Sequence, residues 1–434
     1  LMESLHGSST LNNASTGVIG VTGTDGYAFA VIGSDAVDTI NNSGKINGAI
    51  SLLGGNDAFN NNATGVWDVG TTHATDFGAG NDTLTNAGTV RIGTGGLVSF
   101  GDGNDTINNG GLVDLLGGIS MGAGNDTINN GSLFRINNGT VTMGAGTNAF
   151  NNTNIIKVMG AAGSIDLGGG TLTNSALIDF VDGATDDKLT IAGTLAGTGR
   201  LNIDFNLLTS TADQLQVNGN VAANAVQTVN VQFPGMPVTA HTSAVFARVT
   251  GTSVAGNFVA GQMVGYNEPA NFLDLDLNVT SQINTANTAA DVFSINVDVV
   301  GLNDRGTLAA SVASGAASFL NTQVGTFRQR LGVNPYGDAG KVMSAFFRAY
   351  TAEGDVDPTH AAANFGQGGN FAYDQSTWGR ELGVNANLWG NVHAGVVLGT
   401  ADSRQRLTGS GVGQNRLDGM TWGAYATWYV PQGF

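Results

Sequence analysis

The chain has 434 residues, of which 67 are glycine, 6 are proline and none is cysteine, and its net charge is −17. This acidity argues against nucleic acid as a partner, because phosphate binding depends on excess Lys and Arg. The lack of cysteine excludes thiol catalysis, disulfide frameworks and thiolate metal sites. With 41% apolar residues, the chain can bury a core and is not expected to be disordered.

Residues 1–188 carry a repeat that recurs about every 22 residues. The period is too short for a helical repeat and predicts coils of a parallel β-solenoid. The repeat is registered by an Asp or Asn in each copy: Asp38, Asp57, Asp82, Asp105, Asp126 and Asn148. Each copy then offers one apolar residue to a shared interior: Ile40, Phe59, Leu84, Ile107, Ile128 and Phe150. We expect the following asparagines to stack in ladders, with glycine at the corners.

Structural calcium is an alternative reading of the same repeat. The stretch from Gly78 to Thr85 resembles the haemolysin-type nonapeptide, in which Gly and Asp of successive turns surround Ca²⁺ with oxygen ligands. Those motifs work in tandem at a nine-residue period, which this chain lacks. The Asp positions are therefore interpreted as turn and corner residues.

Candidate catalytic residues are sparse. Gly118–Gly122 matches the nucleophile-elbow pattern around Ser120, but no helix is predicted after it. Asp186 and Asp187 are a possible acid–base pair for cleaving a polysaccharide. The histidines show no ligand spacing: His6, His73, His241, His360 and His393. We therefore assign no catalytic, cofactor-binding or metal-binding residue.

The repeat loses its Asn-Asp corners at about Leu189, and strand patterning continues to Val300. Apolar residues then recur every three or four positions from Leu308 to Leu331, in a segment otherwise rich in Ala, Ser and Gly. This spacing predicts a slim helix, placed either inside a narrow barrel or on the end of the solenoid.

Apolar residues occupy nearly every even position of three later segments: 378–388, 392–398 and 420–430. Since side chains alternate sides along a strand, these segments predict a sheet with one apolar face, preceded by a strand at 343–351. Alternating segments of about ten residues with aromatic ends are typical of outer-membrane β-barrels. Four of the five tryptophans lie here, near strand ends: Trp378, Trp389, Trp422 and Trp428.

The connections predicted between these strands differ in length. Gly390 and Asn391 form a tight turn, whereas 352–373 and 402–416 are long loops. Bacterial barrels combine short periplasmic turns with long extracellular loops, so the pattern indicates an orientation as well. A soluble β-sandwich is the alternative.

The order of β-helix, strand-rich segment, thin helix and barrel strands resembles type V autotransporters over nearly the whole chain. The passenger's C-terminal patterns G-x-G-x-L and D-x-L-x-V-x-G occur within 189–219. The segment Leu320–Arg328 looks like the linker helix that threads the barrel. Phe347–Tyr350 and Tyr373–Gly379 look like the first barrel strands.

The resemblance implies an all-β chain in four parts: a parallel β-helix passenger at 1–188, autochaperone-like strands at 189–303, a short linker helix at 304–335 and an incomplete antiparallel transmembrane β-barrel at 336–434. It implies anchoring in outer-membrane lipid and display on a Gram-negative cell, with the Sec and barrel-assembly machineries as partners. The signal peptide and further barrel strands are expected to lie outside this sequence.

Members that release their passenger carry an Asn-Asn pair before the linker motif, where this chain has Ala317 and Ser318. We therefore expect the passenger to stay attached. For its function we expect adhesion or autoaggregation, because the Asn- and Gly-rich repeats offer hydrogen bonds but no reactive cluster. A secreted β-helical hydrolase of polysaccharides or esters, or a calcium-binding repeat protein, is the alternative.

Overall fold

The computed structural model describes residues 7–20, 29–69, 74–233, 241–264, 272–286, 288–324, 343–356, 372–389, 392–408 and 413–428. The fold is 63% β and comprises a β-solenoid of about eight turns, a helix and a C-terminal four-stranded antiparallel sheet, which confirms the predicted class. Two compact units are present: Leu1–Tyr266 with Leu277–Asp298, and Asn267–Asp276 with Val299–Phe434. The division into four parts at 188, 303 and 335 stays a prediction.

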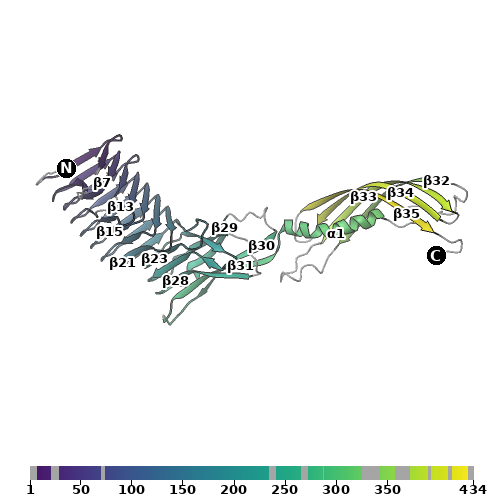
Figure 1. Ribbon diagram of the computed structural model, residues 1–434. Coiled ribbons are helices and arrows are strands. Elements are labelled where there is room, and N and C mark those ends of the chain that lie inside the picture. The colour runs from purple at the N-terminus through teal and green to yellow at the C-terminus, as the bar shows by residue number, and fades with distance from the viewer. Residues whose placement is uncertain are drawn as a thin grey trace. The chain divides into compact units, whose positions relative to one another are not determined.

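The first strands stack as successive coils (Figure 1). They are β1 Ser9–Asn13, β2 Val18–Gly20, β3 Phe29–Ile32, β4 Asp38–Asn42, β5 Lys45–Asn47, β6 Ala49–Ser51, β7 Ala58–Asn61, β8 Val66–Asp68, β9 Thr75–Asp76, β10 Thr83–Asn86, β11 Thr89–Ile92, β12 Leu97–Ser99, β13 Thr106–Asn109, β14 Leu112–Leu115, β15 Gly118–Ser120, β16 Thr127–Asn130, β17 Leu133–Asn137, β18 Thr140–Thr142, β19 Ala149–Asn152 and β20 Ile155–Met159.

The later strands continue the parallel stack and then turn antiparallel, where β28 pairs with β31. They are β21 Gly163–Asn174, β22 Leu177–Asp179, β23 Lys188–Ala196, β24 Arg200–Asn206, β25 Thr211–Ala212, β26 Gln214–Asn218, β27 Gln227–Gln232, β28 His241–Val249, β29 Phe258–Val264, β30 Leu273–Gln282 and β31 Asp291–Leu302, with a 3-10 turn at Ala255–Asn257.

A typical coil contains three short strands, each paired in parallel with its counterpart in the next coil. Strand β13 pairs with β16, β14 with β17, and β15 with β18. The registers place Ile107 against Ile128 and Val113 against Phe134. Equivalent residues of successive repeats therefore form columns that run along the solenoid.

The predicted interior residues Ile40, Phe59, Leu84, Ile107, Ile128 and Phe150 are all buried, at 0–3% exposure. Aromatic rings stack from coil to coil, as in Phe77 on Phe100, whose ring centroids are 4.4 Å apart. A buried side chain of this size contributes roughly 1.5–3 kcal/mol, so one coil cannot offset its own ordering entropy. The coils are therefore stable only as a stack.

The predicted asparagine stacking is confirmed, and its buried part is the second Asn of each repeat. In this asparagine ladder each side-chain amide donates to the next coil at 2.7–2.9 Å, and Gln227 accepts from the last member. Its members are Asn13, Asn42, Asn61, Asn86, Asn109, Asn130, Asn152 and Asn174. The ladder satisfies polar groups that would otherwise be buried without partners.

The second unit contains helix α1, Asp304–Val324, and four antiparallel strands in the order β32-β33-β34-β35 (Figure 1). The strands are β32 Met343–Val356, β33 Tyr373–Trp389, β34 Val392–Leu407 and β35 Gln414–Trp428. The helix packs on the sheet, through hydrogen bonds to Tyr373 and Gln375. No helix within the described residues is both long and apolar enough to cross a bilayer.

The strands of this sheet are longer than predicted. Residues 352–356, 402–407 and 414–416, expected in loops, belong to β32, β34 and β35. The apolar alternation ends before these segments, but backbone pairing continues through polar residues such as Arg404 and Arg416. The predicted Gly390-Asn391 turn and helix residues 325–335 lie outside the described residues.

Candidate functional site

The C-terminal sheet has reversed polarity. Along β33 the odd positions from Tyr373 to Asn385 are buried, and most of them are polar or glycine. The even positions are exposed, with Trp378 at 50% and Leu382 at 59%. In a water-soluble sheet the apolar face is normally the buried one. Here the polar face is covered and the apolar face is open.

Exposed apolar side chains line up across all four strands. The register places Phe347 opposite Leu382, Leu382 opposite Leu398, and Leu398 opposite Trp422. Their exposures are 68%, 59%, 62% and 80% respectively. We call these four residues the outer row. A continuous apolar surface of this kind marks a site that contacts a protein or a membrane.

The buried polar face of the sheet binds the backbone of α1. The Gln375 amide donates to the Gly315 carbonyl at 3.1 Å, and the Asn415 amide donates to the Leu308 carbonyl at 3.0 Å. The hydroxyls of Tyr373 and Ser314 are 2.8 Å apart. These hydrogen bonds fix the rotation of the helix on the sheet.

The helix residues that contact the sheet match the predicted apolar stripe only in part, at Leu308 and Phe319. Val312 and Leu320 of that stripe are 38% and 55% exposed. The buried positions recur every four residues and are mostly small or polar: Thr307, Ser311, Gly315, Phe319 and Gln323. A polar sheet face selects polar helix residues, which a search for hydrophobic periodicity misses. A β-carbon at Gly315 would overlap the Gln405 amide, so the Gln405 side chain would have to move.

A buried ion pair holds the C-terminal half of α1. The Arg348 guanidinium lies 3.3 Å from the Glu381 carboxylate and also donates to the Thr322 carbonyl at 3.2 Å. Both side chains are largely covered, Glu381 at 2% exposure. A cation beside the last carbonyls of a helix complements its dipole. The sequence resemblance singled out Arg348 only as part of a strand, and alternation gives no signal for this pairing.

Ser120, the candidate nucleophile, lies on β15 in a continuous parallel column. Its register partners are Ser99 and Thr142. The strand-turn-helix context of a nucleophile elbow is not present at this position. Among the described histidines, His241 pairs with Asp298 at 2.6 Å and His393 lies on β34.

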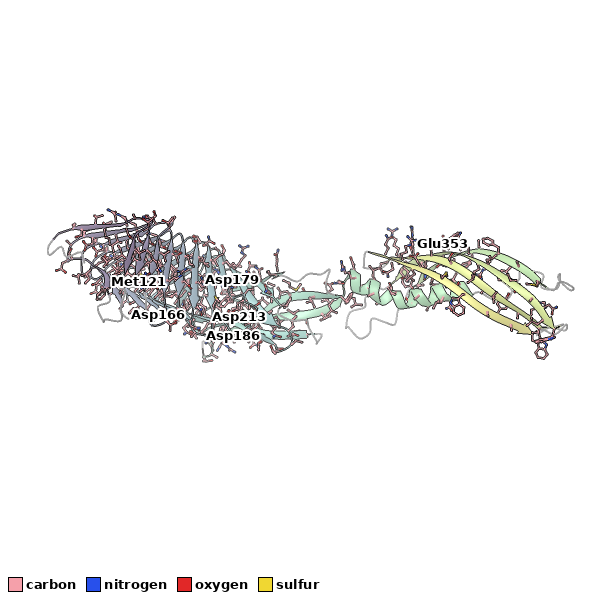
Figure 2. All side chains as sticks on the ribbon, turned by 45° about the horizontal axis from the view of Figure 1, so that its top comes forward. Met121, Asp166, Asp179, Asp186, Asp213 and Glu353 are labelled. Atoms are coloured by element: carbon pink, nitrogen blue, oxygen red, sulfur yellow. The ribbon has the colours of Figure 1, made fainter. Side chains whose placement is uncertain are left out.

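Asp186 and Asp187 do not form a facing pair, because one is exposed and the other is buried at 1%. The Asp187 N–H donates to Asp213 at 3.2 Å, and the Asp204 N–H donates to the other oxygen of Asp213 at 2.9 Å. Figure 2 shows the neighbourhood of Asp186 and Asp213. Burial raises the pKa of Asp187 to about 6 and that of Asp213 to about 8. Sequence reasoning missed this cluster, although Asp213 precedes a strand as the repeat aspartates do.

The repeat aspartates are brought together as a column along the solenoid. We define the carboxyl column as Asp57, Asp82, Asp105 and Asp126, each at most 1% exposed. The backbone N–H of each member donates to the side-chain Oδ1 in the next coil at 2.8–3.0 Å. They occupy corners, as predicted, but these corners are buried because each carboxyl bridges two coils.

Burial shifts the titration of this column. Desolvation raises the pKa of Asp57 and Asp105 to about 7 and that of Asp82 to about 6, and it raises the pKa of Asp126 as well. Within the described residues, no group of three or more His, Asp or Glu side chains is arranged to hold a metal ion. The calcium alternative stays a prediction, tested below.

No protein-family model and no curated protein matches the chain. Among solved structures, the chain is similar to a hyper-glycosylated fragment of TibA, modified by TibC. The identity is 15%, the match covers 58% of this chain and 100% of that fragment, and the TM-score is 0.18. A score this low carries no weight for fold or function.

Proposed function

We propose that this chain is part of a surface-display protein of the autotransporter type. Helix α1 and the C-terminal sheet lie in the outer membrane of a Gram-negative bacterium, and the solenoid is displayed outside. The reversed polarity of β32–β35 carries the proposal. Water would leave the outer row unfavourably hydrated, whereas lipid hydrocarbon covers it without breaking hydrogen bonds.

The size of the apolar band supports a lipid environment. It runs along β33 from Trp378 to Leu388, interrupted only by Arg380, over ten residue steps at about 3.4 Å each. With the strand tilt of about 45° found in membrane barrels, its height is about 24 Å, close to the apolar band of outer-membrane proteins. Beyond Trp378 the outward positions become polar or charged, and Arg416 pairs with Asp402 at 2.8 Å.

The direction of α1 supports an orientation. Its first half contacts the charged end of the sheet, through Leu308 and Asn415. Its second half contacts Arg348, closer to the end where β33 and β34 are joined by a short connection. The chain therefore passes from the solenoid into α1 at the end of the sheet that has the longer connections, residues 357–372 and 408–413. That is the outer end in bacterial barrels.

Single cysteines test this orientation cleanly, because the chain has none of its own. The full chain is exported in Gram-negative cells behind a signal sequence, and the cells are treated with a membrane-impermeant maleimide. Cysteine at Asp186 on the solenoid, or at Glu353 at the charged end of β32 (Figure 2), is expected to react in intact cells. Cysteine at Trp389, at the opposite end of β33, is expected to react only after the outer membrane is permeabilised.

Equal labelling of all three positions in intact cells would contradict the proposed topology. If Trp389→Cys alone were labelled in intact cells, the sheet would have the opposite orientation to the one proposed. Fractionation of the same cells reports whether the chain reaches the outer membrane at all.

For the displayed solenoid we propose adhesion or autoaggregation. Outward asparagines form a second, part-exposed column, in which the Asn129 amide donates to Asn108 at 2.9 Å and the Asn151 amide donates to Asn129 at 3.0 Å. Such amide and hydroxyl surfaces offer many weak hydrogen bonds to another surface. Cells that display the chain are expected to settle faster than cells that do not. Turnover of polysaccharides or esters by the purified full chain, lost in Asp186→Asn or Asp187→Asn, would favour the hydrolase alternative.

A further inference from the structure

The carboxyl column contains a row of buried oxygen atoms without hydrogen-bond partners. The Oδ1 atom of each member accepts a backbone N–H, but the Oδ2 atoms of Asp57, Asp82, Asp105 and Asp126 accept none. An unpaired buried charged oxygen is among the costliest groups in a folded protein. The recurrence in four successive coils shows that this is a feature of the repeat.

The next position of the column shows what surrounds these atoms. Asn148 accepts the Asp126 N–H at its Oδ1 at 2.9 Å, as the aspartates do for one another. Its Nδ2 then donates to three carbonyls, those of Met143 at 3.0 Å, Gly144 at 3.1 Å and Leu167 at 3.1 Å. At Asn148 the second side-chain atom is therefore surrounded by three carbonyl oxygens, and only a hydrogen-bond donor can bind to them. We call these three acceptors the carbonyl cradle.

The backbone pairing and the residue spacing at this point repeat in the preceding coils. The backbone N–H of Phe100, Met121 and Met143 each donates to the next coil at the same point, at 2.7–2.8 Å. Met121 stands five residues before Asp126, as Met143 stands before Asn148. By this equivalence of position in the repeat, the unpaired Oδ2 atoms correspond to the Asn148 amide nitrogen. A carboxylate has no proton to donate there, whereas a carboxylic acid has one.

We propose that the carboxyl column is a set of proton-binding sites: its aspartates fold as neutral acids whose Oδ2–H groups donate to the carbonyl cradle. Each Oδ2–H group donates a hydrogen bond to carbonyls, as the amide of Asn148 does. The solenoid is then a pH-dependent assembly that is tightest in acidic surroundings. This holds whether or not the chain is displayed on a cell.

The charges around the column also favour the neutral acid form of its aspartates. Besides column members, the groups that act on these carboxyls are Asp38, Asp76 and Asp102, all acidic. The folded pKa of about 6–7 exceeds the ordinary value of 3.8. For an acid with a raised folded pKa, the added stability is full below pH 4 and is lost as the pH rises through 6 to 7.

Hydrogen exchange of the full chain tests the proposal, because mass spectrometry of peptides reads the solenoid coils separately from the C-terminal sheet. Protection factors, which correct for the intrinsic pH dependence, are expected to fall at least about tenfold in residues 97–152 between pH 5 and pH 8. Asp105→Asn supplies the donor permanently and is expected to raise protection at pH 8. Asp102→Asn removes an exposed carboxyl of the same coil and is expected to retain most of the pH dependence.

The reverse substitution Asn148→Asp extends the column. It is expected to lower protection at pH 8 and to leave it nearly unchanged at pH 5, so failure to fold at pH 8 alone also supports the proposal. Protection that does not depend on pH, or that falls in Asp105→Asn at pH 8, would overturn it. Loss of protection with EDTA at pH 8, restored by Ca²⁺, would overturn it in favour of a cation column.

Discussion

The solenoid and the C-terminal sheet use the same alternation of apolar and polar residues in opposite directions. In the solenoid, Ile107 points inward and Asn108 outward, with the apolar side chain 1% exposed. In the sheet, Leu398 points outward at 62% exposure while Gln405 is buried against a helix. Alternation alone therefore specifies a sheet with two unlike faces. The surroundings decide which face is covered, and they differ between the two regions.

The largest expected effect comes from the solenoid core. Phe150 is fully buried and lies edge-on to Phe134 at 5.4 Å. Phe150→Ala is expected to lower the free energy of unfolding by about 3–5 kcal/mol in urea titrations, because it leaves a cavity. Leu208→Ala, at a 59% exposed position, is the control and should change it by about 0.5 kcal/mol or less. Equal effects would contradict the interior assigned to the solenoid.

Arginine substitutions at two leucines of similar exposure compare the two regions directly. Leu398 belongs to the outer row at 62% exposure, and Leu208 lies in a turn of the solenoid at 59%. In lipid vesicles, Leu398→Arg is expected to lower the stability of the inserted chain by about 2–4 kcal/mol, because arginine then faces hydrocarbon. Leu208→Arg is expected to stay within about 0.5 kcal/mol. A harmless Leu398→Arg would mean that the outer row faces water.

A smaller effect distinguishes the two asparagine columns. Asn109 accepts from Asn86 at 2.9 Å and donates to Asn130 at 2.8 Å, all three being buried. Asn109→Ala is expected to lower the free energy of unfolding by about 1–3 kcal/mol in urea titrations, because its ladder neighbours lose their partners inside the protein. The adjacent Asn108→Ala, on the outer column, should cost less because water replaces the lost bond. The opposite order would refute the buried ladder as a source of stability.

The smallest effect concerns one corner. Leu53 adopts φ 69°, at the position where other coils have glycine, such as Gly78 at 100°. This conformation strains a side chain with a β-carbon by about 1 kcal/mol. Leu53→Gly is expected to raise stability by about 0.5 kcal/mol, since the relief is partly offset by the freer unfolded chain. Leu53→Ala keeps the β-carbon and should give no gain. Calorimetry of both variants beside the unchanged chain measures the difference.

The sequence predicted the repeats well because each coil carries its own register mark. Asp105 and Asp126 fixed the coil length, and Ile107 and Ile128 fixed the inward face. What could not be predicted was the use of the carboxyls, because inter-coil hydrogen bonds join residues 19–25 positions apart.

In the sheet, the limits of prediction have a different cause. Hydropathy located the strands while their outer face was apolar and lost them where Arg404 and Arg416 continue that face. The helix was found from its spacing, but apart from Phe319 most of its buried stripe was not, since Ser311 and Gly315 carry no apolar signal. Contacts between polar residues produce little hydrophobic periodicity, so the sequence alone does not predict which helix residues make them.

The most direct test of the reversed sheet is tryptophan quenching by brominated lipid. Two variants of the full chain are compared in vesicles, one retaining only Trp422 at 80% exposure and one retaining only the fully buried Trp67 of the solenoid, with the other tryptophans replaced by Phe. We predict strong quenching of Trp422 and unchanged emission from Trp67. Unquenched Trp422, with the chain recovered free of vesicles, would contradict the central claim that lipid covers the apolar face.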